Sequence, residues 1–329
     1  MVLSVNDVTV TIDRPRRTAV HPVRGVSLSL KAGETLALVG ESGCGKSMTC
    51  LALAGLLPNR AAIASGTLVL DGTDLGTLSP RDARDLRRRK MASVFQDATG
   101  GLNPVRSIGW QVAQAVRMRG GATRHAAQQE AVRLLGRVGL PDPERRAREF
   151  PHQFSGGMNQ RAMIALAIAG NPKLLIADEA TTALDVTLQA QILELIADLR
   201  RALGMGVLFV THDLGLVAQH ADSVAVMYAG RIVERASTDS LFANPRHPYT
   251  QGLLAALPDA MGASARLASI DGTVPPIDAL PAGCAFAPRC VRASAICTST
   301  VPDTVRGLAC HHPGPRVRPA VPAMQKEYS

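Results

Sequence analysis

The sequence predicts an α/β fold with an antiparallel β part, an inserted helical part and a small cysteine-containing C-terminal extension. Continuous apolar runs at Thr35–Gly40 (TLALVG) and Leu174–Asp178 (LLIAD) have the composition of buried parallel strands. Between them, residues 97–170 change to a helical, arginine-rich pattern punctuated by Pro and Gly, which indicates an inserted helical subdomain. Periodicity fades after Asn244, so we expect one domain over 1–243 and an extension over 244–329.

Local patterns predict the other elements. Residues 4–12 and 26–30 alternate as antiparallel strands do, and a helix should run from Lys46 to about Leu57. Gly66–Leu70, Met91–Phe95 and Val207–Val210 read as strands, and Val224–Val233 as a hairpin turning at Ala229-Gly230. A later helix should end at Gly204 and bury an apolar stripe on one face. The stripe consists of Leu188, Ile192, Leu195, Ile196 and Leu199.

Composition narrows the class of protein. The chain has 329 residues, 46% hydrophobic and 19% charged, which is typical of a globular protein. Its net charge of +9 would suit nucleic acid or an anionic membrane surface. Only 3% of residues are aromatic and the arginines are scattered along helical stretches, so we do not expect nucleic-acid binding. The basic run Arg87–Lys90 is expected to be a solvated helix end.

The chain shows no sign of its own membrane anchor. No apolar run approaches the ~20 residues that span a bilayer. The N-terminus alternates like a strand and does not resemble a signal peptide, so we expect a cytosolic protein unless a partner holds it at a membrane. Six cysteines in that compartment indicate thiols or metal ligands more than disulfides.

Gly40–Ser47 (GESGCGKS) fits the phosphate-loop pattern G-x-x-x-x-G-K-[ST] and stands between a predicted strand and a predicted helix. Glycines let the backbone curve around phosphate oxygens, so that N–H groups and the helix N-terminus face the anion. Lys46 would place a positive charge near the β- and γ-phosphates, and the Ser47 hydroxyl would bind Mg²⁺. The match and its context disfavour a chance glycine-rich loop.

The strand Leu174–Asp178 ends in two acids, Asp178 and Glu179. Asp178 suits a Mg²⁺ ligand acting through water, and Glu179 suits a base that polarises an attacking water. An apolar strand ending in Asp-Glu is a weak signal alone. It gains weight because the phosphate loop precedes it and Thr181–Asp185 (TTALD) follows it.

Together these motifs resemble the ATP-binding cassette (ABC) ATPases. Besides the phosphate loop and Asp178-Glu179, the family's order and spacing are matched by Gln96 after a strand, Ser155–Gln160 (SGGMNQ), Ala183–Asp185 and His212 after a strand. The resemblance covers about residues 4–240. It implies a RecA-like core with an antiparallel β subdomain and an inserted helical subdomain.

The resemblance also implies the ligands ATP and Mg²⁺ and a role for each matched residue. ATP contacts within the chain are implied for Gly40, Ser42, Gly43, Cys44, Gly45, Lys46, Ser47, Met48 and Gln96, and Mg²⁺ contacts for Ser47, Gln96 and Asp178. The catalytic residues implied are Glu179, His212 and Gln96. A lone histidine is more often structural, but its place after this strand favours a γ-phosphate contact.

Other implied residues act on a second subunit. Ser155, Gly156 and Gly157 would contact the γ-phosphate of ATP bound by the opposite subunit, and Asp185 would communicate across the dimer. A Ser-Gly-Gly turn at a helix start is itself an anion site. Two ATP molecules would then join a head-to-tail dimer that hydrolysis releases.

A narrower resemblance is to the ATP-binding subunits of dipeptide, oligopeptide and nickel importers. It rests on Phe95–Asp97, Leu102–Pro104, Pro151–Met158, Ala183–Glu194, Asn244–Thr250 and the cysteine-bearing tail. It implies two membrane-spanning permease subunits, contacted by the helical subdomain and the loop after Gln96. It further implies a second, different ATP-binding chain, an indirect link to an extracytoplasmic binding protein, and a place on the cytoplasmic face of the membrane.

Two alternatives come from other classes. A soluble cassette ATPase acting on DNA or ribosomes would commonly carry tandem cassettes or long coiled-coil insertions, and this sequence has neither. A nucleotide-binding regulator without turnover is disfavoured by the presence of Glu179 and His212.

The tail holds Cys284, Cys290, Cys297 and Cys310 in a C-x5-C-x6-C-x12-C arrangement. Grouping of four thiols suggests shared ligation, but the spacing matches neither common zinc pairs nor ferredoxin runs. Zinc, an iron–sulfur cluster and free buried thiols therefore stay open on spacing alone. The importer resemblance implies a structural [4Fe–4S] cluster.

The sequence departs from the family at several positions. Asn159 replaces a basic residue, Phe154 a leucine and Ala180 a proline, and none of these removes a phosphate contact. The aromatic residue that should stack on adenine is missing near Val10–His21, where Ile12 or His21 are the candidates to replace it.

Overall fold

The computed structural model describes residues 1–94, 100–179, 185–257 and 270–314. The chain divides into two compact units. The phosphate-loop unit comprises Ser4–Leu28, Thr35–Leu68 and Val210–Ser329. The helical unit comprises Met1–Leu3, Ser29–Glu34 and Val69–Phe209.

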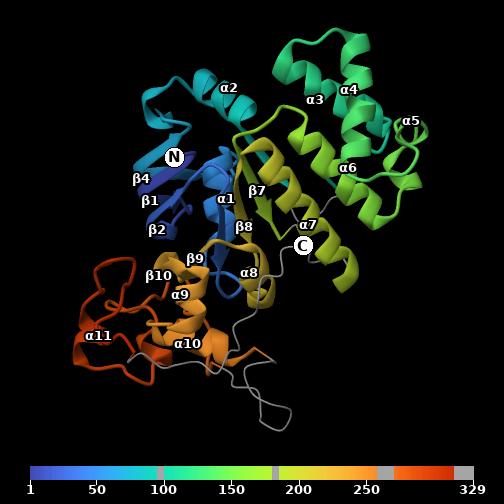
Figure 1. The fold of residues 1–329 in the computed structure, drawn as a ribbon. Helices are drawn as coiled ribbons and strands as arrows, with labels where there is room; N and C mark the ends of the chain where they lie inside the picture. Colours follow the sequence, from blue (N-terminus) through green and yellow to red (C-terminus); the bar gives the residue numbers. More distant parts are fainter. Residues whose placement is uncertain (95–99, 180–184, 258–269, 315–329) are drawn as a thin grey trace. The chain divides into compact units, whose positions relative to one another are not determined.

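The elements run from strands at the N-terminus, through a block of consecutive helices, to a second group of strands and helices (Figure 1). The strands are β1 (Leu3–Ile12), β2 (Val20–Leu30), β3 (Thr35–Val39), β4 (Ala61–Leu70), β5 (Thr73–Asp74), β6 (Met91–Val94), β7 (Leu174–Asp178), β8 (Gly206–Val210), β9 (Ser223–Tyr228) and β10 (Arg231–Ser237). The helices are α1 (Lys46–Ala54), α2 (Pro80–Lys90), α3 (Ile108–Gly120), α4 (Arg124–Arg137), α5 (Pro143–Arg146), α6 (Gly156–Ile168), α7 (Val186–Leu203), α8 (Leu214–His220), α9 (Thr238–Ala243), α10 (Pro248–Ala255) and α11 (Ala295–Ser299).

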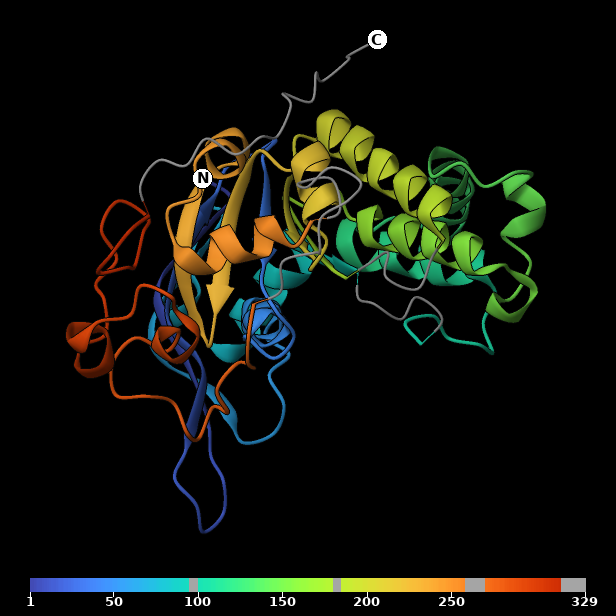
Figure 2. The same ribbon diagram turned by 90° about the horizontal axis from the view of Figure 1, so that it is seen from below.

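In the phosphate-loop unit, β3 is buried at every position and pairs in parallel with β9. The predicted hairpin is confirmed: β9 and β10 pair antiparallel around a turn in which Ala229 (φ 43) and Gly230 (φ 85) both have positive φ. Strands β2, β1 and β4 are hydrogen-bonded neighbours in that order. The first two strands, dark blue in Figure 2, are joined by a hairpin loop. Tyr249 of α10 packs edge-on against Tyr228 of β9, with ring centroids 4.7 Å apart.

In the helical unit, β6 pairs in parallel with β7, and β8 lies on the other side of β7. Helices α3, α4 and α6 pack together within the segment predicted to be helical (Figure 1). The face of α4 that contacts them carries Ala127 and Ala131, both fully buried. Small residues there let the helices approach closely. At the start of α3, Gly109 lies against Ala147, the residue after α5, and its N–H donates to the Ala147 carbonyl at 2.9 Å.

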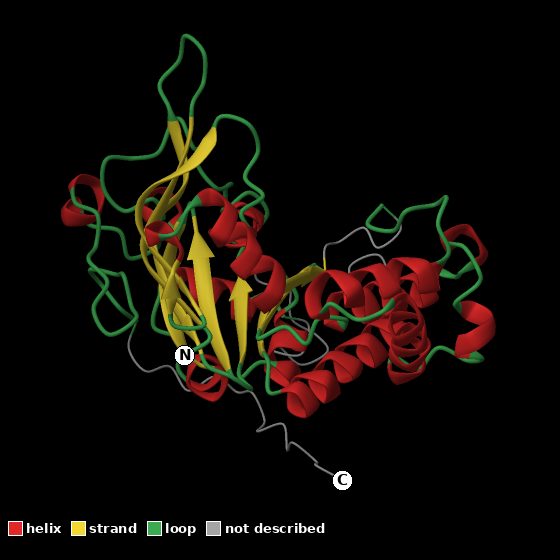
Figure 3. Cartoon of the chain, turned by 90° about the horizontal axis from the view of Figure 1, so that it is seen from above, coloured by secondary structure: helices red, strands yellow, loops and turns green. Residues whose placement is uncertain are grey.

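Residues after α10 form mostly loops with short helical turns (Figure 3). This segment covers the edge strand β10, because Arg235 N donates to Gly307 O at 2.7 Å and Ala309 N to Val233 O at 2.9 Å. Sheet edges expose unpaired backbone groups, so the extension satisfies groups that β10 would otherwise present to water.

Three expectations about element ends needed correction. Strand β2 begins at Val20, before the expected residue 26. Helix α1 ends at Ala54 and not near Leu57, because Gly55 takes a left-handed conformation (φ 71) and Leu56 N donates to Leu51 O at 2.8 Å. Strand β4 begins at Ala61, before the expected Gly66. The Phe95 end of another predicted strand lies outside the described residues.

In the stripe predicted for α7, Ile192, Ile196 and Leu199 are buried, whereas Leu188 and Leu195 are half-buried. The remaining local predictions are confirmed. Gly204 (φ 60) ends α7, and β7 covers Leu174–Asp178 as predicted. The basic run Arg87–Lys90 forms the last turn of α2, where positive charge complements the helix dipole and Lys90 pairs with Asp71 at 2.8 Å. Among the described residues, no helix combines the length and apolar character that crossing a bilayer requires.

Candidate nucleotide-binding site

The phosphate loop connects the buried strand β3 to α1 and depends on its glycines. Gly40 (φ 153) and Gly45 (φ 110) have backbone conformations that residues with a side chain rarely adopt. A Cβ at Gly40 would collide with the Met227 carbonyl, and one at Gly45 with the Pro22 carbonyl. Both positions therefore require glycine, and the loop is held against neighbouring backbone.

Lys46 begins α1 and its side chain is buried, with 6% of the residue exposed. Its Nζ donates to the carbonyl oxygens of Gly40 at 2.6 Å and Glu41 at 3.0 Å, both in the loop. The loop backbone therefore fixes the position of the Lys46 ammonium group. The N-cap residue Gly45 supplies no side-chain cap, so the first-turn N–H groups of α1 suit an anion.

The remaining loop residues show which atoms are accessible. Ser42, Gly43 and Ser47 are exposed, so the Ser47 hydroxyl can reach a bound cation. Met48 is half-buried. Burial raises the pKa of the Cys44 thiol against the opposing effect of Lys46, which keeps Cys44 a protonated packing residue.

In the helical unit, Asp178 and Glu179 occur where β7 ends. Asp178 is 7% exposed and Glu179 is half-buried. Glu179 has φ 48, a left-handed conformation that is unfavourable for a residue with a side chain. Such strain is typical of functional sites, where the surrounding structure holds a side chain in a required direction.

Ser155 is the N-cap of α6 and accepts a hydrogen bond from Met158 N at 3.3 Å. Gly156 and Gly157 form the first turn, so this signature segment has the helix-start geometry expected of an anion site. A Cβ on Gly157 would lie 2.5 Å from the Leu188 side chain of α7. Gly157 is therefore also needed for packing α6 against α7, which sequence reasoning missed.

Packing accommodates two of the departures from the family pattern. Asn159 is 4% exposed and its Nδ2 donates to the Pro151 carbonyl at 3.1 Å. Phe154 is 9% exposed, and the Arg146 guanidinium lies 6.0 Å from its ring centre. Both side chains pack in the interior of the helical unit. Asn159 and Phe154 therefore leave the exposed face of Ser155 unaltered.

The other predicted residues are placed as follows. Asp185 is exposed and caps α7, accepting from Leu188 N at 2.9 Å. His212 is exposed just after β8, in the phosphate-loop unit. Gln96 and the segment 180–184, with Ala180 and Ala183-Leu184, lie outside the described residues.

Both candidates for the adenine contact are described. Ile12 ends β1 and is half-buried, whereas His21 is exposed on β2. His21 Nδ1 lies 3.0 Å from Thr11 Oγ1, which fixes its ring against the neighbouring strand. Neither side chain offers the base as large a flat surface as the missing aromatic ring would.

The four tail cysteines lie near one another. Burial raises the pKa of Cys310 to about 11, with smaller increases from the Cys284, Cys290 and Cys297 thiols. Cys284 N also donates to Cys297 O at 2.8 Å. Within residues 1–94, 100–179, 185–257 and 270–314, no three His, Cys, Asp or Glu side chains are placed to bind a single metal ion.

Comparison with known proteins decides the family. Residues 23–182 match the ABC transporter family and residues 233–297 match the oligopeptide/dipeptide transporter C-terminal region. The dipeptide transport ATP-binding protein DppD of Bacillus subtilis is 45% identical over 307 residues, covering 93% of this chain and 91% of that protein. The chain belongs to the ABC transporter ATP-binding proteins. A protein of Sinorhizobium fredii named as the probable peptide ABC transporter ATP-binding protein y4tR is 49% identical over 280 residues, covering 84% of each chain.

Solved structures of ABC cassettes share the fold. The dimeric cassette MJ0796, in a post-hydrolysis state bound to ADP and Pi, aligns with a TM-score of 0.63 and 27% identity over 72% of this chain and 98% of its own. CbiO1 of Clostridium perfringens, part of the complex cbiONQ, aligns with a TM-score of 0.63 and 27% identity over 73% and 90%. As a member of this family, the ABC protein described here is an ATPase, which confirms the predicted fold class and activity.

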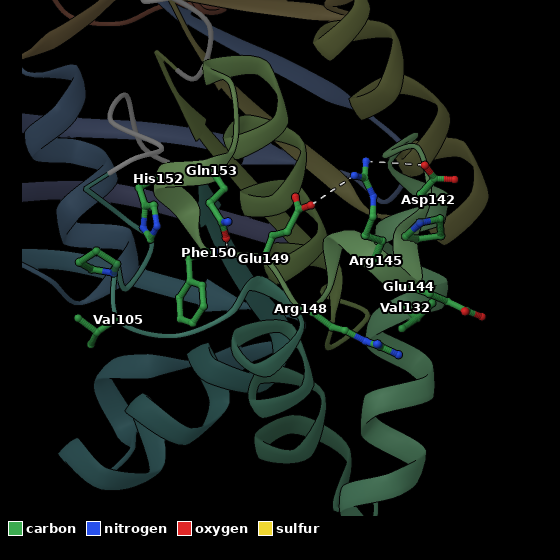
Figure 4. Close-up of a pocket in the computed structure, with 12 residues that line it drawn as sticks. Val105, Val132, Asp142, Glu144, Arg145, Arg148, Glu149, Phe150, His152 and Gln153 are labelled. Atoms are coloured by element: carbon green, nitrogen blue, oxygen red, sulfur yellow. Dashed lines mark hydrogen bonds and ion pairs between the residues drawn. The ribbon is translucent and has the colours of Figure 1, made fainter.

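A groove of about 1260 Å³ lies in the helical unit of this ABC protein (Figure 4). The groove is lined by Pro104, Val105, Val132, Asp142–Arg145, Arg148, Glu149, Phe150, His152 and Gln153. Val105 is 75% exposed and Phe150 37% exposed. The Phe150 ring stacks on His152 with centroids 5.7 Å apart, so this part of the groove presents aromatic surface. The remaining lining includes five charged side chains, those of Asp142, Glu144, Arg145, Arg148 and Glu149. It holds no residue of the phosphate loop and is not the nucleotide site.

Sequence reasoning missed how the extension contacts the phosphate loop. Arg289 forms an ion pair with Glu41, Nη1 to Oε2 at 2.8 Å. Tyr249 Oη accepts a hydrogen bond from Glu41 N at 2.8 Å. The only sequence signal was charge: an acid within a loop that binds phosphate requires a partner.

Proposed function

We propose that this ABC protein hydrolyses ATP to power import of peptides or a related small solute such as nickel across the cytoplasmic membrane. The observation that carries the proposal is the match of the tail to the oligopeptide/dipeptide transporter region, together with relatives named for peptide and dipeptide transport. These matches disfavour the soluble class that acts on DNA or ribosomes.

The residues divide the chemistry among them. Lys46 and the loop amides would bind the β- and γ-phosphates. Ser47 and Gln96 would supply oxygen ligands of the kind that Mg²⁺ prefers, and Asp178 would hold the ion through water. When bound, Mg²⁺ neutralises charge that develops on the phosphates. Glu179 takes the proton of the attacking water, and His212 contacts the γ-phosphate.

A complete site requires a second subunit. Ser155, Gly156 and Gly157 face the γ-phosphate of ATP bound by the partner, and Asp185 transmits its state across the dimer. The dimeric ADP- and Pi-bound cassette MJ0796 supports this arrangement. We propose that the partner is a homologous but different chain.

The permease contact follows from the groove in the helical unit. Its apolar rim, with Val105 and Phe150 exposed, suits a short helix of a membrane-spanning partner. Two permease subunits would hold the dimer at the cytoplasmic face, and the extracytoplasmic binding protein would act through them.

Phe150→Asp should uncouple the protein from its permease. In proteoliposomes holding both ATP-binding chains, the permease pair and the binding protein, wild type should take up peptide with ATP. Replacing the aromatic ring with a carboxylate should cut uptake about tenfold or more, because an aromatic contact with the permease is lost, while basal ATPase activity stays unchanged. Uptake and phosphate release are measured together.

Met118→Asp is the matched control, since Met118 is 59% exposed in the helical unit and outside the groove. It should transport normally. Uptake by Phe150→Asp equal to that of this control would refute the docking surface. Uptake of nickel without uptake of peptide would show that nickel is the substrate. Uptake of neither would refute the import proposal.

We further propose that the extension of residues 244–329 holds a [4Fe–4S] cluster on Cys284, Cys290, Cys297 and Cys310. Their mutual proximity supports it. A four-iron cluster spaces its thiolates farther apart than one ion does, which is compatible with the lack of a single-ion site in the described residues. The cluster would stabilise an extension that has little regular structure.

Protein purified without oxygen should be brown, with absorbance near about 400 nm from thiolate–iron charge transfer and about four irons and four sulfides per chain. Cys297→Ser should lose both colour and iron. Stoichiometric zinc without iron would contradict the cluster, and four titratable thiols with no metal would indicate free cysteines.

A further inference from the structure

The second residue of the phosphate loop is held from two sides by residues that follow Asn244. The Glu41 backbone N–H donates to Tyr249 Oη, and burial raises the pKa of Tyr249 so that the phenol stays protonated. The Glu41 carboxylate accepts hydrogen bonds from both terminal nitrogens of Arg289, Nη1 at 2.8 Å and Nη2 at 3.1 Å. All of these residues belong to the phosphate-loop unit.

Arg289 is itself fixed in place. Its side chain is 5% exposed, Nε donates to Asp271 O at 2.8 Å and Nη2 to Ile270 O at 3.2 Å. The guanidinium lies about 6 Å from the ring centres of Tyr228 and Phe286. A planar guanidinium with a bidentate carboxylate and two backbone acceptors has one orientation, so the contact fixes the direction of the Glu41 side chain.

The pair has an electrostatic purpose. A carboxylate in a loop that binds triphosphate would repel the ligand unless a cation neutralises it. Lys46 does not contact this carboxylate through any described hydrogen bond; it donates to the carbonyl oxygens of Gly40 and Glu41. Arg289 is therefore the cation that neutralises Glu41, which leaves the Lys46 charge for the phosphates.

We propose that Arg289 is a positioning residue for MgATP binding, which the C-terminal extension supplies to the phosphate loop through Glu41. It touches neither ATP nor the reacting atoms. Arg289 immediately precedes Cys290, so the fold of the extension sets the geometry of the nucleotide site. The inference rests on ATP hydrolysis and is independent of the imported solute.

Arg289→Gln should raise KM for MgATP about tenfold and leave kcat within about twofold, because it exposes the phosphates to an unneutralised Glu41. Glu41→Gln should have a smaller effect. The double variant Glu41→Gln/Arg289→Gln should recover most of the lost affinity, since no carboxylate then remains to repel the ligand. Arg289→Lys, which keeps the charge, should lie between wild type and Arg289→Gln.

Lys90→Gln is the control, because it removes an ion pair of the same 2.8 Å length, with Asp71, outside the phosphate loop. Thermal unfolding of each variant identifies loss of folding. Additive effects of the two substitutions, or an equal drop in kcat and affinity with Arg289→Lys no better than Arg289→Gln, would show that Arg289 only stabilises the fold and would overturn the proposal.

Discussion

Glu179→Gln should stop ATP turnover while leaving ATP bound. The amide is nearly the same shape as the carboxylate but cannot accept the proton of the attacking water, so turnover should fall about 10²–10⁴-fold. The left-handed backbone at Glu179 (φ 48) is unchanged by this substitution, and the side chain should keep its direction. Phosphate release and retention of radiolabelled MgATP after gel filtration measure the two effects.

Glu194→Gln serves as the control, since Glu194 is exposed on α7 in the same unit. It should hydrolyse ATP at the wild-type rate. Turnover by Glu179→Gln equal to that of the control would mean that another group is the base. ATP-stabilised dimers in the Glu179→Gln variant should also elute earlier on gel filtration than the nucleotide-free protein.

Lys46→Ala should abolish both binding and turnover. The buried Nζ is the only charged group that donates to the Gly40 and Glu41 carbonyls among the described hydrogen bonds. Loss of Lys46 removes the positive charge that faces the phosphates and the hydrogen bonds that hold the loop. We therefore expect kcat/KM to fall about 10²–10³-fold or more. Binding of a fluorescent ATP analogue and steady-state hydrolysis measure both effects.

Lys173→Ala is the control for this substitution, because Lys173 is an exposed lysine before β7. Glu179→Gln and Lys46→Ala should differ in binding: Glu179→Gln should keep ATP, whereas Lys46→Ala should not bind it. Hydrolysis by Lys46→Ala at more than about a tenth of the wild-type rate would show that the phosphate loop does not act in turnover as described.

Local sequence rules predicted most of the elements near the site. The phosphate-loop pattern, the strand ending at Asp178 and the turn at Ala229-Gly230 depend on neighbours within a few residues. Caps and turns are local for the same reason. The error at the end of α1 arose because apolar periodicity continued to Leu57, whereas the left-handed preference of Gly55 ended the helix.

The sequence by itself determined the chemistry: a phosphate loop, an acidic pair and a Ser-Gly-Gly helix start in one order. Only the tertiary structure showed what else those residues do. Gly157 must be small because Leu188 lies against it, and Glu41 is neutralised by an arginine 248 positions away. Neither contact is visible to periodicity or spacing, since packing and charge pairing join residues by distance in space and not along the chain.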